Sequence, residues 1–342
     1  MNLQKFLFFL LISTPVIVFS APIGAITHWY CDTIQEKSLS LGAEWKKLVC
    51  NGTGIPLFGD SNSITVNAVI ADLSSKYGLR LLPATSSKGP SGFNLDSLDK
   101  IALANTPSSN EKLLAGINGG YFYRLDVKTF FDGVCIGKTS SDANLPPSFT
   151  TPNNGINDGT IVSSGKLLGS NCDCVGYSRP VVLSINGTNS RFDLLTRGAE
   201  PPFGLTLDSI ASSPNLVSTN VTGSYVNIPS DDDNLGNILE HSANTAVCLR
   251  PTLDGNSIEV VMITIDGYDG CSSFNSTCGT NAFSQGYFLK DYFNCTSGMN
   301  MDQGGSTTMW INGQGNNGIV SNSGGGPRSI ASGLFLVGPE SS

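Results

Sequence analysis

Short runs of apolar and β-branched residues alternate with turns rich in Gly, Ser and Asn along most of the chain, and such runs predict strands. Residues 64–82 predict a first strand or hairpin, and residues 113–122 predict a strand that runs into a glycine turn. A stretch rich in Ser, Thr, Asn, Gly and Pro at 139–171 predicts a long loop or a hairpin excursion. Further strands are predicted at 180–185, 245–250, 258–265, 307–313 and 332–338.

Residues 281–293 predict the clearest helix. Phe283, Tyr287, Phe288 and Phe293 fall roughly on one helical face in this segment. Strands nevertheless outnumber helices, and no repeat of 20 to 50 residues is visible. We therefore predict a strand-rich α+β fold with mixed or antiparallel β-sheets and flanking helices.

The first residues predict a signal peptide. Lys5 precedes an apolar run at 6–19, and Val18 and Ser20 are small enough for a signal peptidase site, so cleavage is expected after Ser20. The alternative is an N-terminal membrane anchor, but the run falls short of the roughly 20 residues that span a bilayer. No later stretch is long and apolar enough to span. We expect a chain that is secreted or held in the periplasm or secretory-pathway lumen.

The remaining sequence predicts one main domain. Residues 21–62 read as an irregular N-terminal segment, residues 63–338 as the domain and residues 339–342 as a tail. The net charge of −8, with only 13% charged residues, argues against nucleic acid or an anionic membrane surface as the partner, because both need clustered Lys and Arg. The apolar content of 39% is too high for a disordered chain.

Nine cysteines indicate an oxidising compartment, and the odd number leaves at least one free, buried or intermolecular. Cys31 with Cys50 and Cys271 with Cys278 are plausible local pairs, although the sequence leaves the connectivity open. Five N-x-S/T sequons resemble glycosylation sites, but a chain this rich in Asn, Ser and Thr produces about that many by chance. The sequons are at Asn51, Asn186, Asn220, Asn275 and Asn294.

Four segments share one pattern, an apolar strand that ends in a glycine-rich turn with a polar side chain. They are residues 116–122, 244–248, 263–270 and 300–313. Strand ends of this kind hold polar groups above a core, and glycines let another backbone or a ligand come close. The Gly-Gly-Ser turn after Asp302 can also form an anion-binding nest. Taken singly, each segment is also compatible with a plain turn.

In this order, the segments resemble the phosphodiester glycosidase domain family, over roughly residues 113–338. INGGYF at 117–122 and NMDQGGSTTM at 300–309 carry the most specific similarity. NTAV at 244–247, IDG at 265–267 and PRSIASGLFLV at 327–337 support it. The resemblance implies hydrolysis of a sugar 1-phosphodiester, such as an N-acetylglucosamine 1-phosphodiester, at the anomeric carbon.

The chain departs from the family pattern at four motif positions. Asn244 and Tyr268 stand where the family has Arg, and Cys248 and Gln303 stand where it has Gly. Arginine binds phosphate strongly and in a bidentate manner, so the loss of two arginines weakens the case for phosphodiester recognition. Arg328 is retained.

The resemblance also implies a site. Asp302 and Asp266 are the candidate catalytic carboxylates, which would stabilise an oxocarbenium-like centre, attack it or activate water. Asn118 and Thr245 would hold sugar hydroxyls, and Arg328 with Ser306 and Thr307 would hold the leaving phosphate. The full predicted substrate-binding set is Asn118, Gly119, Gly120, Tyr121, Asn244, Thr245, Gly304, Gly305, Ser306, Thr307 and Arg328.

Several alternatives stay open at this stage. Tyr121, Phe122 and Trp310 either stack on sugar or belong to the core, and core packing is favoured. No cofactor is required, although calcium near Asp302 is compatible with the sequence. A catalytically weak or inactive carbohydrate-binding protein, or an envelope structural protein, remains compatible with the same fold.

Overall fold

The fold is described from a computed structural model. The described residues are 26–54, 63–86, 95–107, 110–124, 155–157, 161–169, 181–186, 190–194, 208–227, 241–268, 278–326 and 328–340. Among them, no helix is long and apolar enough to cross a membrane.

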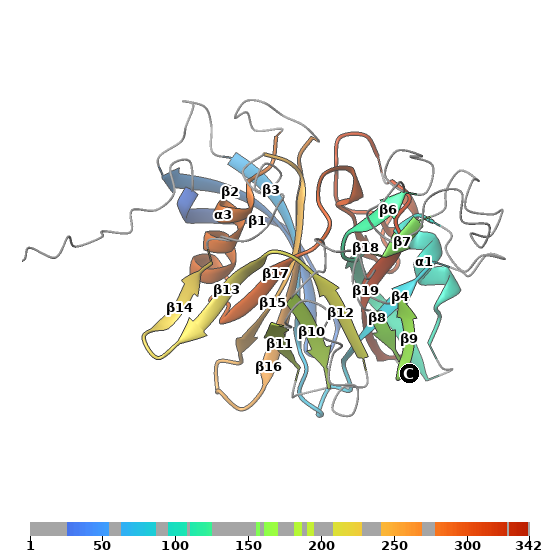
Figure 1. The fold of residues 1–342 in the computed structure, drawn as a ribbon. Coiled ribbons are helices and arrows are strands. Elements are labelled where there is room, and N and C mark those ends of the chain that lie inside the picture. Colours follow the sequence, from blue (N-terminus) through green and yellow to red (C-terminus); the bar gives the residue numbers. More distant parts are fainter. Residues whose placement is uncertain are drawn as a thin grey trace, which may run out of the picture.

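An eight-stranded antiparallel sheet forms the larger part of the molecule (Figure 1). Its order is β1 (Ile26–Ser40), β2 (Ala43–Gly54), β3 (Ser63–Asp72), β16 (Ile258–Ile265), β15 (Asn244–Pro251), β17 (Ser297–Asn300), β13 (Asn215–Asn220) and β14 (Gly223–Val226). β3 therefore pairs with β16, a strand nearly 200 residues later in the chain, and joins the N-terminal hairpin to the rest of the sheet.

Three smaller antiparallel sheets complete the strand structure of the described residues. The four-stranded sheet has the order β18 (Met309–Ile311), β5 (Glu111–Asn118), β19 (Ser332–Pro339) and β4 (Arg80–Thr85). The five-stranded sheet has the order β11 (Arg191–Leu194), β10 (Val181–Ile185), β12 (Asp208–Ser212), β8 (Ile161–Ser163) and β9 (Lys166–Gly169). β6 (Phe122–Arg124) pairs with β7 (Gly155–Asn157).

One core joins the three larger sheets. Trp45 and Met262 come from the eight-stranded sheet, Leu334 from the four-stranded sheet and Leu183 from the five-stranded sheet, and all four are buried there. Successive residues of β16 point to opposite faces, so Met262 enters this core while Ile263 enters a second core. Burial on both faces explains why β16 is an almost unbroken apolar run.

Helices cover two outer faces. The predicted helix at 281–293 is confirmed as α3 (Ala282–Tyr287) followed by a π-helix (Phe288–Tyr292), and Asn281 caps it by accepting a hydrogen bond from the Ser284 N–H at 2.8 Å. This helical segment packs on the eight-stranded sheet, and the second core lies between them (Figure 1). The helix α1 (Leu98–Ala104) packs on the four-stranded sheet. The strand-rich, antiparallel part of the predicted fold is confirmed, but helix is so scarce that the fold is mostly β.

The predicted irregular segment at 21–62 is wrong over residues 26–54. β1 and β2 form a long hairpin, and β2 continues the sheet by pairing with β3. Most β1 side chains are exposed because β1 is an edge strand, so its sequence lacks the apolar alternation that marks a half-buried strand. The predicted disulfide between Cys31 and Cys50 is confirmed as a cross-strand bond within this hairpin.

The segment at 64–82 contributes two strands that belong to different sheets. β3 pairs with β2 and β16, whereas β4 pairs with β19, so the two do not form a hairpin. Parts of the predicted excursion at 139–171 lie outside the described residues, and its described parts contain β7, β8 and β9.

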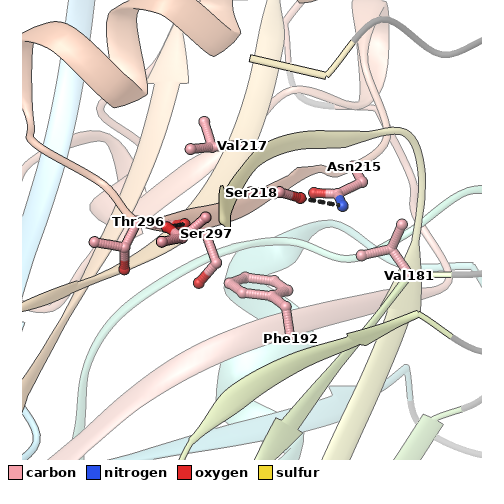
Figure 2. A pocket seen from close by; sticks show the side chains of 8 residues that line it. Val181, Phe192, Asn215, Val217, Ser218, Thr296 and Ser297 are labelled. Carbon is pink, nitrogen blue, oxygen red and sulfur yellow. Dashed lines mark hydrogen bonds between the residues drawn. The ribbon is translucent and has the colours of Figure 1, made fainter. Parts of the chain in front are cut away.

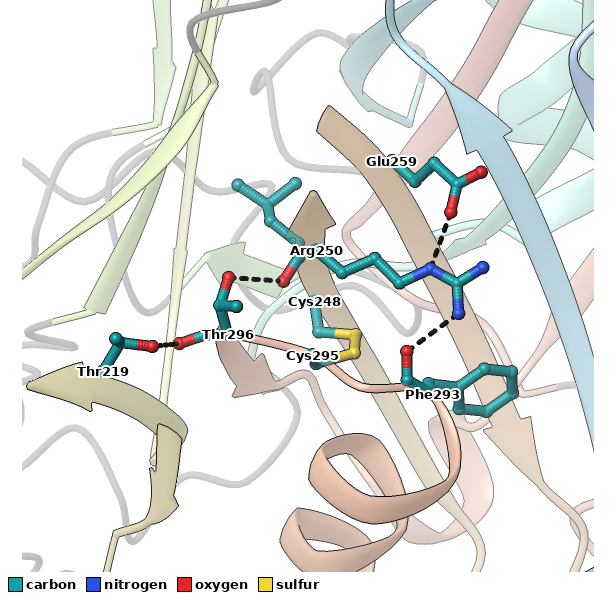
Figure 3. The surroundings of a disulfide bond; sticks show 8 residues. Thr219, Cys248, Arg250, Glu259, Phe293, Cys295 and Thr296 are labelled. Atoms are coloured by element: carbon teal, nitrogen blue, oxygen red, sulfur yellow. Dashed lines mark hydrogen bonds and ion pairs between the residues drawn. A yellow bond between two sulfur atoms is a disulfide. The ribbon is translucent and has the colours of Figure 1, made fainter. Parts of the chain in front are cut away.

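A second disulfide joins Cys248 on β15 to Cys295, just before β17 (Figure 3). Arg250 lies beside it, donating from Nε to Glu259 Oε2 at 2.6 Å and from Nη1 to the Phe293 carbonyl at 2.8 Å. These contacts fix the chain between the π-helix and β17. Cys271 lies outside the described residues, so its pairing with Cys278 stays a prediction.

Candidate functional site

The glycines after β5 are required by protein packing. A Cβ at Gly119 would lie 2.1 Å from Ser332 Oγ, and a Cβ at Gly120 would lie 2.3 Å from the Ala211 carbonyl oxygen. The Gly119 N–H donates to the Ser332 carbonyl at 2.7 Å. The space beside these glycines is therefore filled by neighbouring strands, and their predicted role in ligand approach is not supported.

The side chain of Asn118 connects three segments of the site. Its Oδ1 accepts from the Thr245 hydroxyl at 2.6 Å and from the Thr308 N–H at 3.0 Å. Its Nδ2 donates to the Asp302 carbonyl at 2.8 Å. Asn118 and Thr245 have no exposed surface. We therefore assign them to support of the Asp302 backbone rather than to the predicted contact with sugar hydroxyls.

Asp302 follows β17 and faces Arg328. Its backbone N–H donates to the Gly119 carbonyl at 3.1 Å, and its Oδ1 accepts from the Gln303 N–H at 2.9 Å. Its Oδ2 lies 3.7 Å from Arg328 Nη2. The Asp302 side chain is 9% exposed and that of Arg328 is 37% exposed. The Asp302 carboxylate and the Arg328 guanidinium thus lie next to each other at a part of the surface that solvent reaches.

Arg328 extends across the glycine turn that follows Asp302. Its Nη2 donates to the Ser306 hydroxyl, and its guanidinium carbon lies 5.8 Å from the centre of the Phe122 ring. A Cβ at Gly305 would lie 3.6 Å from Nη1. Since Ser306 is fully buried, its hydroxyl orients Arg328.

The turn itself does not present the predicted row of free N–H groups. Gly304 adopts φ +64°, which favours glycine, and its N–H donates to the Ala243 carbonyl at 2.8 Å. The N–H groups of Ser306 and Thr307 donate to the carbonyls of Gln303 and Gly304. Two of the three donors of the predicted anion nest, the N–H groups of Gly304 and Ser306, are therefore engaged within the protein. The Thr307 hydroxyl is buried without a hydrogen-bond partner.

The Asn244 side chain forms hydrogen bonds within the protein. Its Nδ2 donates to the Ser242 carbonyl at 3.0 Å, to the Thr280 hydroxyl at 3.2 Å and to the Thr280 carbonyl. It joins the start of β15 to the residue before the cap of α3, and it has no exposed surface. Its predicted contact with substrate is not supported.

Asp266 follows β16 and holds the loop 321–326. Its Oδ1 accepts from the Asn322 N–H at 2.9 Å and from Asn67 Nδ2 at 3.3 Å. Burial raises the pKa of Asp266 to about 6, against the opposing effects of the Asn322 N–H and the charge of Lys47. A carboxyl group with this pKa exchanges its proton near neutral pH, as a general acid or base must.

The fold brings Asp266 and Asp302 to the same end of the eight-stranded sheet, where β16 and β17 finish. β16 and β17 flank β15 and both run antiparallel to it, so both end at its start. Two strand spacings separate their backbones by about 10 Å. Ala243 lies between the two turns, because its carbonyl accepts from Gly304 and its N atom would be 2.8 Å from a Cβ at Gly267.

The aromatic residues near the site divide into two groups. Phe122 and Trp310 pack against the core beneath α1, as favoured from the sequence. Tyr121 is half-buried, and its hydroxyl accepts from Asn300 Nδ2 at 3.1 Å. Asn300 begins the 300–309 motif and was missed as a partner of Tyr121, since nothing in the sequence pairs residues 179 positions apart.

A buried amide on α3 was also missed. Gln285 is fully buried, and neither atom of its amide has a hydrogen-bond partner. Nothing in the sequence distinguished Gln285, because the aromatic residues of segment 281–293 were the basis for predicting a helix there. No group of three or more His, Cys, Asp or Glu side chains suited to a metal ion occurs among the described residues. Calcium near Asp302 stays an untested expectation.

A model of the phosphodiester glycosidase family matches residues 112–337. The match spans most of the chain and includes every residue of the predicted site. The chain therefore belongs to the phosphodiester glycosidase family.

Solved structures share the fold at low identity. The catalytic domain of zebrafish N-acetylglucosamine-1-phosphodiester alpha-N-acetylglucosaminidase, described as auto-inhibited by its pro-peptide, is 18% identical with a TM-score of 0.54, over 90% of this chain and 87% of that one. A protein of Burkholderia pseudomallei is 12% identical with a TM-score of 0.53, over 93% and 98% of the two chains. A Synechocystis protein is 11% identical with a TM-score of 0.52, over 87% and 62%. No curated protein sequence matches the chain.

Proposed function

We propose that this chain hydrolyses a sugar 1-phosphodiester at the anomeric carbon, with Asp302 and Arg328 as its central pair. Family membership supports a hydrolase of this class. The observation that carries the proposal is the 3.7 Å approach of Asp302 Oδ2 to Arg328 Nη2 at a partly exposed rim. The supporting network of Asn118 fixes the Asp302 backbone in that position.

The geometry suits a phosphodiester because a single bridging oxygen separates its phosphorus from the anomeric carbon. A phosphate held by the exposed edge of Arg328 would bring that carbon close to the Asp302 carboxylate. Asp302 then either attacks the carbon, forming a glycosyl ester that water hydrolyses in a second step, or stabilises the positive charge of the carbon while water attacks. The bond between the anomeric carbon and the bridging oxygen breaks, and the products are the free sugar and a phosphate monoester.

Asp266 has a supporting role in this proposal. It holds the loop 321–326, which precedes Arg328 in the chain, and its raised pKa allows it to carry a proton near pH 6. A phosphate monoester is a good leaving group, so the reaction does not depend on strong acid assistance. Asp266 is accordingly expected to matter less than Asp302.

We infer further that the protein works in an oxidising compartment, in a secreted or lumenal location. The disulfides Cys31–Cys50 and Cys248–Cys295 support this inference. The predicted signal peptide at 1–20 lies outside the described residues and remains part of the proposal.

A second candidate function is carbohydrate binding with weak or no turnover. The observation that favours it is Asn244, whose side chain is committed to Ser242 and Thr280 and replaces a family arginine. Of the three cations that the resemblance places at the site, this chain retains Arg328.

The test is release of free sugar from a panel of sugar 1-phosphodiesters, including UDP-N-acetylglucosamine, beside neutral aryl glycosides. Asp302→Asn should lower turnover by about 10²–10⁴-fold with an unchanged melting temperature. Asp32→Asn is the matched control, since Asp32 is an exposed carboxylate on β1. Turnover of neutral glycosides alone would contradict the phosphodiester proposal. Sugar binding without turnover of any substrate would favour the second candidate.

A further inference from the structure

A groove lies away from the Asp302 site, where the eight-stranded and five-stranded sheets diverge. It has a volume of about 430 Å³, which is within the usual range of small-molecule sites. Figure 2 shows side chains of both sheets directed into the same space. The lining residues are Val181, Phe192, Asn215, Val217, Ser218, Thr219, Thr296 and Ser297.

One wall of the groove offers a hydrogen-bond acceptor beside a donor. Asn215 Nδ2 donates to Ser218 Oγ at 2.9 Å, while Asn215 Oδ1 is buried with no hydrogen-bond partner. Ser218 Oγ also accepts from Asn227 Nδ2 at 2.9 Å. Because this hydroxyl oxygen already accepts two bonds, its own proton is available for donation. The adjacent acceptor and donor match two neighbouring hydroxyl groups of a ligand.

The other wall is apolar and aromatic. The ring of Phe192 and the side chain of Val181 come from the five-stranded sheet. Sugar rings have an apolar face of C–H groups that packs on aromatic rings, with hydroxyls at the ring edge. All eight lining residues are uncharged, so a phosphate or carboxylate on the ligand would find no counter-charge among them.

We propose that this groove binds an uncharged saccharide. The ligand packs a ring face on Phe192 and presents adjacent hydroxyls to Asn215 and Ser218. Ser297 supplies a further hydroxyl at the edge of the groove (Figure 2).

The groove is separate from the Asp302 site. Asn215 pairs with Met299 of β17, three residues before Asp302, and Ser297 begins the same extended strand about 17 Å from Asp302. The site beside Asp302 carries both a carboxylate and a guanidinium, whereas the groove carries neither. The proposal therefore does not depend on turnover at Asp302.

The test measures binding of neutral saccharides to the folded, oxidised chain by saturation-transfer NMR and calorimetry. The probes are chitobiose, cellobiose, mannobiose and maltotriose at millimolar concentrations. At least one probe should bind. Phe192→Leu, which keeps an apolar side chain but removes the ring, should weaken that binding by about tenfold, equivalent to roughly 1.4 kcal/mol.

Ser297→Phe is the second variant, because it fills the groove from a partly exposed position and should abolish binding. Ser38→Phe adds the same ring to an exposed position on β1 and should leave binding unchanged. Asp302→Asn should also leave binding unchanged. The proposal is overturned if no probe binds, if binding survives Ser297→Phe, or if Asp302→Asn abolishes binding and so places the saccharide at the other site.

Discussion

The Asp266 carboxylate accepts the Asn322 backbone N–H at 2.9 Å, and this bond ties the end of β16 to the loop 321–326. The Gly267 N–H donates to the Asn322 carbonyl at 3.0 Å, so two consecutive residues hold Asn322 from both sides. Tyr268 continues the contact, since a Cβ at Gly324 would lie 2.2 Å from its ring. The Asp-Gly-Tyr turn thus acts as a clamp on the loop that leads to Arg328.

Titration of Asp266 should make the chain less stable as the pH rises from about 4 to about 6. The pKa of Asp266 is raised to about 6 in the folded state, against 3.8 in the unfolded chain, so the folded state holds more protons in this window. Two pKa units correspond to about 3 kcal/mol. Asp266→Asn removes the titrating group, so its unfolding free energy relative to the parent should rise by about that amount between pH 4 and pH 7.

Chemical denaturation at several pH values checks this prediction. Asp254→Asn is the control, because hydrogen bonds from Thr252 and Asn256 lower the pKa of Asp254 to about 2 in the folded state, so its effect on stability has the opposite sign to that of Asp266 and is almost complete above pH 5. Parallel profiles for Asp266→Asn and the parent would show that Asp266 does not titrate in this range.

Replacing Asn118 should lower stability and activity together. Asn118→Ala leaves the Thr245 hydroxyl and the Thr308 N–H without their buried acceptor, at a cost of about 2–4 kcal/mol. Asn256→Ala, at an exposed turn, should cost much less. Denaturation curves and the phosphodiester assay test both effects. Lost activity with an unchanged unfolding free energy would instead show that Asn118 contacts the substrate.

Substitution of Gly120 should be strongly destabilising because of steric overlap. A Cβ there would meet the Ala211 carbonyl oxygen, a backbone atom of β12 that cannot rotate away. Gly120→Ala should cost about 3 kcal/mol. Gly315→Ala is the matched control, since no atom lies within 4 Å of its Cβ and its φ of −57° suits alanine. Equal melting temperatures for the two variants would contradict the packing assignment.

The Cys31–Cys50 and Cys248–Cys295 disulfides should differ in their contribution to stability. The Cys248–Cys295 bond closes 47 residues and the Cys31–Cys50 bond closes 19. Loop-closure entropy predicts losses of about 4 and about 3 kcal/mol when each pair is replaced by alanine. Denaturant unfolding of the two double variants gives the comparison. A larger loss for the hairpin disulfide would indicate that packing around the sulfurs, rather than chain entropy, dominates.

Much of the strand pattern could be predicted from the sequence. The runs at 113–122, 245–250 and 258–265 are confirmed as β5, β15 and β16. Short continuous runs of apolar and β-branched residues predict buried strands well, because such residues favour the extended backbone. Partners could not be predicted. β3 and β4 follow each other in the chain yet join different sheets, and their partners β16 and β19 lie about 190 and 250 residues away.

The sequence motifs named residues that lie close to Asp302 in the fold, but the sequence did not show what several of these side chains contact. Asn118, Thr245 and Asn244 have polar side chains of the kind that bind sugars, and the sequence does not show which way they face. In the structure all three are buried and form hydrogen bonds with neighbouring segments of the chain. Asp302 and Arg328 meet at the rim, as the resemblance implied for a carboxylate and a phosphate-binding cation.

The position of β19 has a consequence for how the chain is made. β19 lies between β4 and β5 and pairs with both, so neither strand can form these hydrogen bonds until residues 332–339 have been synthesised. During synthesis the ribosome releases β4 and β5 more than 200 residues before their common neighbour. The unpaired strand edges must then avoid aggregation for most of translation, and chaperone binding to β4 and β5 would protect them during that time.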